Sequence, residues 1–153
     1  MINLKIDELL EKDGEILDIP VGYSMWPMLK NRKDSIVIKR AEFPLQNNDV
    51  VLYRRGDKCV LHRFLKKKGD VLIIRGDNCR INEYDITENR IFGVLKGFYK
   101  GDKYIDCKTN KAYKCYVWLW RFTYIPREFV VKPIYHFSLR VLGKILRILK
   151  IKK

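Results

Sequence analysis

The stretch KCVLHRFLKKKGDVLIIR, residues 58–75, decides the fold class. Two runs rich in apolar residues, 58–64 and 70–75, stand on either side of the turn signal KGD at 68–70. Short apolar runs bounded by Gly and Asp are typical of β-strands that are separated by turns. The stretch therefore predicts two short strands with a turn between them.

The same alternation of short apolar runs and turn signals continues on both sides of this stretch. Further strand-like runs cover residues 15–21, 35–40, 49–54, 90–98 and 103–106, and the breaks carry Gly, Asn and Asp at 55–57, 76–78 and 100–102. Short strands at this spacing predict a mainly β fold, an all-β sandwich or partly open barrel rather than a parallel α/β sheet. Ahead of them, residues 3–12 place apolar side chains near helical spacing, which predicts a short helix ended by Asp13-Gly14.

The composition limits the classes of protein to which the chain can belong. Its 153 residues are 47% hydrophobic, which favours one domain and excludes a wholly disordered chain. The net charge of +14 predicts attraction to something anionic: nucleic acid, an acidic polypeptide or an anionic lipid surface. Because no stretch of 18 uncharged apolar residues occurs, a conventional membrane-spanning helix is not expected.

The N-terminus and the cysteines both favour a reducing compartment. Residues 1–20 contain recurring acids with no small-residue cleavage site after them, which is unlike a secretory signal peptide. We therefore expect the chain in the cytoplasm, with peripheral attachment at the inner face of the membrane as an option. The four cysteines include no CxxC pair, and reduced thiols are expected there: Cys59, Cys79, Cys107 and Cys115.

From about residue 112 the sequence becomes aromatic-rich and basic. Residues 113–153 hold ten basic residues and one acid, Glu128, a net charge of +9. Arg140, Lys144 and Arg147 share one face of a helix, and the other side holds Val141, Leu142, Ile145, Ile148 and Leu149. Pro126 and Pro133 are expected to break the region into at least two pieces. We predict a catalytic β domain at 1–111, short N-terminal helix included, and a basic helical extension at 112–153.

The most specific motif is VGYSMWPML at residues 21–29. A serine nucleophile needs a backbone that exposes its Oγ and leaves nearby N–H groups free to hold an oxyanion. Gly22 gives the chain conformational freedom before Ser24, and Pro27 makes the exit rigid. By itself the motif is only a turn that contains a serine, and a serine in a turn ordinarily caps the backbone.

The order of the motifs that follow the serine carries a family resemblance. They are KDSIVI at 33–38, NDVVLY at 48–53, VLHR at 60–63, RGDN at 75–78 and IFGVL at 91–95. With the Ser24 motif, this order resembles the type I signal peptidase superfamily, which includes the LexA-type self-cleaving repressors, over residues 20–97. The resemblance implies a signal-peptidase-type β-barrel domain and a serine endopeptidase, a hydrolase that uses Ser24 on peptide bonds by an acyl-enzyme route. That route needs no cofactor and no metal.

The resemblance also assigns the general base. Its position is His62, as in the endoplasmic-reticulum, archaeal and spore-former enzymes, whereas most bacterial signal peptidases and the LexA-type proteins have Lys there. An imidazole with a pKa near 6.5 can take a serine proton at neutral pH, but a lysine would need strong desolvation. A carboxylate should hold the imidazole tautomer. Asp77, which matches a family aspartate, is preferred, with Glu83 and Asp85 as alternatives; Asp77 could instead simply cap its turn.

The sequence is compatible with three other interpretations. A self-processing repressor is disfavoured because the 23 residues before Ser24 contain neither Ala-Gly nor Cys-Gly, and because His62 replaces the Lys. Zinc binding by Cys59, His62 and Cys79 is disfavoured because residues 59 and 62 of one strand point to opposite faces.

The third interpretation is a non-catalytic binding module that uses the basic C-terminal helix. Interleaved basic and aromatic residues can bind nucleic acid, but a basic amphipathic helix fits an anionic membrane surface better. Packing of that helix on the domain's own core is the alternative. The favoured prediction is an endopeptidase that takes a leader or precursor peptide, entering as an extended strand, near the cytosolic face of a membrane.

Overall fold

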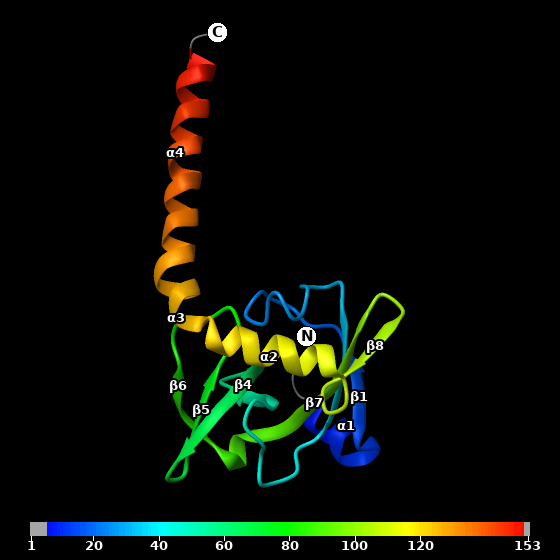
Figure 1. Ribbon diagram of the computed structural model, residues 1–153. Coiled ribbons are helices and arrows are strands. Elements are labelled where there is room, and N and C mark those ends of the chain that lie inside the picture. The colour runs from blue at the N-terminus through cyan, green and yellow to red at the C-terminus, as the bar shows by residue number, and fades with distance from the viewer. Residues whose placement is uncertain (1–5, 152–153) are drawn as a thin grey trace. The chain divides into compact units, whose positions relative to one another are not determined.

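The computed structural model describes residues 6–151 (Figure 1). The chain divides into two compact units, one up to Cys115 and one from Tyr116 onward. Among the described residues, the first unit contains the following elements, before a further helix that begins at Lys111: α1 (Ile6–Asp13), β1 (Glu15–Asp18), β2 (Ser35–Arg40), β3 (Val50–Arg55), β4 (Lys58–Lys68), β5 (Val71–Arg75), β6 (Glu83–Thr87), the short 3-10 turn η1 (Glu88–Arg90), β7 (Ile91–Lys100) and β8 (Lys103–Asp106).

The strands form one antiparallel sheet that curves into a half-barrel (Figure 1). Along the sheet the order is β1-β2-β7-β3-β4-β5-β6, and β8 pairs with β7. Helix α1 packs on β1, β2 and β7. The prediction of a mainly β fold without a parallel α/β sheet is therefore confirmed.

Most strands lie where the turn signals predict them, but several boundaries differ. Strand β1 ends at Asp18, three residues before the predicted end, and β4 continues four residues beyond the predicted run 58–64. Strands β3, β5 and β7 are shifted or extended by one or two residues. Helix α1 ends one residue later than predicted, where the Gly14 N–H donates to the Leu10 carbonyl at 3.1 Å; residues 3–5 of the predicted helix lie outside the described residues. Strand β6 was not predicted, because its sequence EYDIT mixes charged and apolar residues and Ile86 alone is buried. It forms the edge of the sheet by pairing with β5.

The main core lies on one face of the sheet and places His62 at its margin. It contains residues of β3 to β7: Val51, Tyr53, Phe64, Leu72, Ile74, Ile86, Ile91 and Val94. His62 on β4 pairs directly with Val51 on β3. Residues directly opposite in an antiparallel pair share a face. The imidazole therefore belongs to the core face and is only 3% exposed.

The C-terminal part is helical, as predicted. It comprises α2 (Lys111–Phe122), α3 (Tyr124–Pro126), the π-helical turn η2 (Arg127–Val131) and α4 (Lys132–Ile151). Pro126 ends α3, whereas Pro133 lies in the first turn of α4, where no intrahelical partner for its missing N–H is needed. Within residues 6–151, no helix has both the length and the apolar character required to cross a membrane.

Candidate active site

Ser24 lies in the loop between β1 and β2. Consecutive turns shape this loop, with Trp26 N–H donating to the Tyr23 carbonyl at 3.1 Å and Leu29 N–H to the Met25 carbonyl at 2.9 Å. Met25 and Leu29 are buried, so apolar side chains anchor the loop while Ser24 itself stays half-buried. Gly22 has φ of 114°, a conformation that residues with a Cβ rarely adopt.

The turn after β5 holds the backbone of this serine loop. The backbone N–H of Asn78 donates to the Ser24 carbonyl at 2.8 Å, and the Asn78 Nδ2 donates to the Tyr23 carbonyl at 3.1 Å. The RGDN motif at 75–78 is therefore joined directly to the Ser24 motif. Two stretches that are far apart in the sequence therefore meet through Asn78, which donates hydrogen bonds to the carbonyl groups of two consecutive residues, Tyr23 and Ser24.

Gly76, in the same turn, lies between the serine loop and the imidazole. A Cβ at this position would lie 2.7 Å from the Ser24 carbonyl oxygen and 3.0 Å from the His62 Nε2. Both atoms are therefore neighbours of one point in space, and only glycine leaves room for them. Ser24 and His62 also line one pocket of about 1030 Å³. The structure thus brings the predicted nucleophile and the predicted base to one site.

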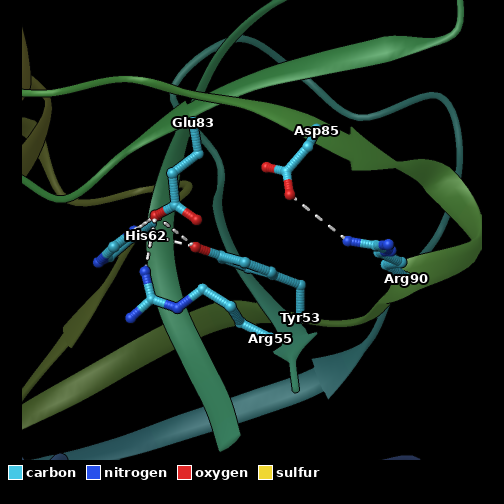
Figure 2. Close-up of polar contacts among 6 residues, drawn as sticks. All are labelled: Tyr53, Arg55, His62, Glu83, Asp85 and Arg90. Carbon is cyan, nitrogen blue, oxygen red and sulfur yellow. Dashed lines mark hydrogen bonds and ion pairs between the residues drawn. The ribbon is translucent and has the colours of Figure 1, made fainter.

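The other imidazole nitrogen is held by a carboxylate. His62 Nδ1 lies 2.8 Å from the Glu83 Oε1 on β6, and the hydroxyl of the fully buried Tyr53 donates to the same oxygen at 2.7 Å (Figure 2). Tyr53 Oη is also 3.1 Å from Nδ1, and the Arg55 Nη1 reaches Oε1 at 3.4 Å. A carboxylate at Nδ1 selects the tautomer that carries its proton there, which leaves Nε2 as the acceptor.

The electrostatics keep this imidazole neutral. Burial lowers the pKa of His62, and the Glu83 carboxylate opposes that shift without cancelling it. Burial and the neighbouring Glu83 charge raise the pKa of Tyr53, so its hydroxyl stays protonated and acts as a donor. At neutral pH the site therefore presents an imidazole with an unprotonated Nε2 near Ser24.

Neither of the other two candidate acids, Asp77 and Asp85, forms the hydrogen bond to His62 Nδ1. Asp77, the preferred acid in the sequence, forms a two-point ion pair with Arg63, at 2.7 Å from Nε to Oδ1 and 2.6 Å from Nη2 to Oδ2. Asp85 is exposed and points toward Arg90, 3.8 Å away (Figure 2). The hydrogen-bonding position at Nδ1 that we expected for Asp77 is occupied by Glu83, the first of the two alternatives.

The Arg63–Asp77 pair is part of the scaffold beneath the site. Both side chains are buried, and Arg63 Nη1 also donates to the Asn48 carbonyl at 2.9 Å and to the Tyr113 hydroxyl at 3.2 Å. Burial lowers the pKa of Arg63, but the Asp77 charge outweighs it and the net shift is upward. The pair ties the turn that carries Gly76 to the residue after His62, and so sets the distance between the two halves of the site.

Sequence reasoning missed Tyr53 as a site residue, although a signal was present. The Gly56-Asp57 turn fixes the β3–β4 register, in which Tyr53 pairs with Val60. His62 is two residues along β4 from that partner and on the same face, within reach of a tyrosine hydroxyl. The sequence around Glu83 gives no comparable signal, because the mixed pattern of EYDIT does not indicate a strand or its partner.

Comparison with known proteins does not supply a family. The sequence matches no protein-family model, and no curated protein is significantly similar to it. The function therefore has to be argued from the chemistry of the site.

Proposed function

We propose that this protein is a serine endopeptidase of the signal-peptidase type, in which Ser24 is the nucleophile and His62 the general base. The observation that carries the proposal is the position of His62. Its Nε2 faces the Ser24 loop across Gly76, and its Nδ1 is 2.8 Å from a carboxylate. A nucleophile, a base and a group that orients the base are the minimum set for acyl transfer.

The proposed reaction has two halves. Ser24 Oγ attacks the peptide carbonyl while its proton moves to His62 Nε2, and the same proton is then given to the leaving amine as the C–N bond breaks. Water hydrolyses the acyl-enzyme by the same proton route in reverse. Glu83 stabilises the imidazolium formed in each half, and the Ser24 backbone N–H is the donor assigned to the oxyanion.

The fold is consistent with this assignment. An antiparallel half-barrel carries the serine in the loop between β1 and β2 and the histidine on β4, in the order in which the sequence motifs occur. The buried Arg63–Asp77 pair, which follows the base and precedes Asn78, couples the two motifs. These features support a catalytic domain of the signal-peptidase type.

The pocket also favours a peptide substrate. Its lining includes residues 18–22, before Ser24, and residues 58–61, before His62 on β4. Strand β4 pairs with β5 from Arg63 onward, so its earlier part has β3 as its one ladder neighbour among the described strands. An extended peptide can add to a strand edge of this kind through main-chain hydrogen bonds. Such a peptide would run past His62 and Ser24, as expected for a leader or precursor.

The test uses a library of precursor peptides with the full-length protein. Cleavage should be lost in Ser24→Ala and in His62→Ala, and mass spectrometry should detect an acyl adduct on Ser24 in the wild type. Matched controls are Ser138→Ala, an exposed serine in α4, and His136→Ala, at the second histidine in the sequence. Equal cleavage by all five proteins would assign the activity to a contaminant and remove the proposal.

A further inference from the structure

The C-terminal unit exposes an unusual amount of apolar surface. Large hydrophobic side chains from Tyr116 onward are exposed in every one of its elements: Trp118, Leu119, Phe122, Ile125, Phe129, Val130, Val131, Ile134, Tyr135, Phe137, Leu139, Val141 and Leu142. The most exposed of them is Phe122, at 74%. Single exposed apolar residues are ordinary, but thirteen within one small unit are typical of a surface that binds something apolar.

The charges of the same region have one sign. After Glu128, which is buried, the sequence contains no acid, and the charged residues of α4 are all basic: Lys132, Arg140, Lys144, Arg147 and Lys150. The partner must therefore offer negative charge as well as apolar surface.

Helix α4 separates these two properties around its circumference. Arg140, Lys144 and Arg147 lie on one side at spacings of four and three residues. Exposed apolar side chains form two further rows, with members three or four residues apart: Ile134, Phe137 and Val141 in one row, and Tyr135, Leu139 and Leu142 in the other. The 20 residues give a helix about 30 Å long. A narrow basic face beside a broad apolar face is typical of helices that lie in a membrane interface.

Aromatic residues of α2 extend the same pattern. The Trp118 and Phe122 rings stack with centroids 5.5 Å apart, and both are exposed. Arg127 lies 3.4 Å above the Trp120 ring and donates to the Trp120 carbonyl at 2.9 Å, which connects η2 to α2 within this unit. Exposed tryptophan and other aromatic side chains favour the headgroup level of a bilayer.

From these observations we infer that the C-terminal unit docks on an anionic bilayer surface. Helix α4 lies in the interface with its apolar rows toward the acyl chains and Arg140, Lys144 and Arg147 toward the headgroups. Nucleic acid would satisfy the cations but leave the apolar rows in water. A second copy of the unit would bury the rows but bring like charges together. An anionic bilayer satisfies both, and this inference does not depend on the proposed protease activity.

The test is co-sedimentation of the full-length protein with vesicles of phosphatidylcholine alone or mixed with phosphatidylglycerol. We expect binding to the mixed vesicles that weakens as salt is raised. The tryptophan emission should shift to shorter wavelength, and Trp118→Tyr should remove much of that shift. Lys144→Glu with Arg147→Glu should weaken partitioning about thirtyfold or more, since each basic residue near the surface contributes about a factor of five.

The control variant carries the same change of net charge elsewhere. Lys66→Glu with Lys103→Glu, at exposed positions of β4 and β8, should bind vesicles nearly as well as the wild type. Phe137→Ser with Leu142→Ser should lose binding even at low salt, whereas Ser24→Ala should bind normally. No binding to the mixed vesicles, or equal loss in both charge-reversal variants, would overturn the inference. So would binding to an RNA or DNA oligomer, or a stable dimer, in place of vesicle binding.

Discussion

Two isosteric substitutions, Asp77→Asn and Glu83→Gln, should have opposite effects on stability and on catalysis. Each replaces a carboxylate by an amide of the same shape. Asp77 is paired with Arg63 in the interior, whereas Glu83 lies against the His62 imidazole and lines the pocket. The pair of variants therefore asks which acid serves the fold and which serves the reaction.

The structure sets the size of the stability effect. The side chains of Arg63 and Asp77 are 2% and 3% exposed, so Asp77→Asn leaves a buried guanidinium with only neutral acceptors, the Asn48 carbonyl and the Tyr113 hydroxyl among them. Leaving one buried charge without its partner destabilises a protein by about 3–5 kcal/mol, a large part of a typical total of about 5–15 kcal/mol. The double variant Arg63→Met with Asp77→Leu should recover much of this loss, because it removes both charges.

The same reasoning gives Glu83→Gln a small stability effect and a large catalytic one. The Glu83 side chain is 18% exposed, and a glutamine can still accept the Tyr53 hydroxyl bond. We expect at most about 1.5–3 kcal/mol of destabilisation, the usual contribution of a hydrogen bond to a charged group. The amide can present an N–H to His62 Nδ1 and favour the wrong tautomer, so kcat should fall by roughly 10²–10⁴-fold.

Urea unfolding followed by tryptophan fluorescence measures the first effect, and kcat on the best library peptide measures the second. Both measurements are made at a temperature well below the thermal unfolding midpoint of the least stable variant, so that every protein is folded before urea or substrate is added. A Glu83→Gln protein with the wild-type rate, together with a stable but inactive Asp77→Asn protein, would refute the reasoning and make Asp77 the acid that orients His62.

Three further predictions concern His62, Gly76 and Tyr53. Because burial holds the pKa of folded His62 below its ordinary value near 6.5, kcat/KM should stay on its plateau to below about pH 6.5. As pH falls, the unfolded chain binds this proton before the folded chain does, so His62 should reduce the stability of the fold in that range. NMR titration of the ring should show a still lower pKa in Glu83→Gln. A wild-type His62 pKa above about 6.5 would contradict the expected pH profile and the expected loss of stability. Gly76→Ala should lower kcat with a native circular dichroism spectrum, since its Cβ meets the Ser24 carbonyl and His62 Nε2; full activity would mean that the serine loop and His62 do not meet over this turn. Tyr53→Phe removes a donor from Glu83, which leaves more negative charge facing the imidazole, so the pKa of His62 should rise in the NMR titration; an unchanged pKa would show that the hydroxyl does not act on this pair.

The strands predicted most accurately are those with local signals. Strands β2 and β8 begin and end where their sequences predict, because each is a short run bounded by turn residues. Asn48, two residues before β3, adopts φ of 80°, a conformation that asparagine tolerates. Helical spacing alone likewise predicts that Arg140, Lys144 and Arg147 share one side of α4.

Glu83 is the residue for which local reasoning was insufficient. Its strand has a mixed pattern and gains its place by pairing with β5, a contact between segments that no local propensity reports. Asp77 was preferred because it lies in a motif of the expected order. The structure shows that Arg63, the neighbour of His62, takes both of its oxygens.

The sequence by itself determined that a strand-rich part precedes a basic helical part, and it identified Ser24 and His62 as candidates. Periodicity, turn residues and motif order are local properties of the sequence. Only the tertiary structure decided which acid reaches His62, that Tyr53 joins it, and that Gly76 and Asn78 bring Ser24 to the same pocket. The physical reason is that a hydrogen bond of 2.8 Å depends on strand register and on competition among partners. Both are settled when distant segments pack against one another.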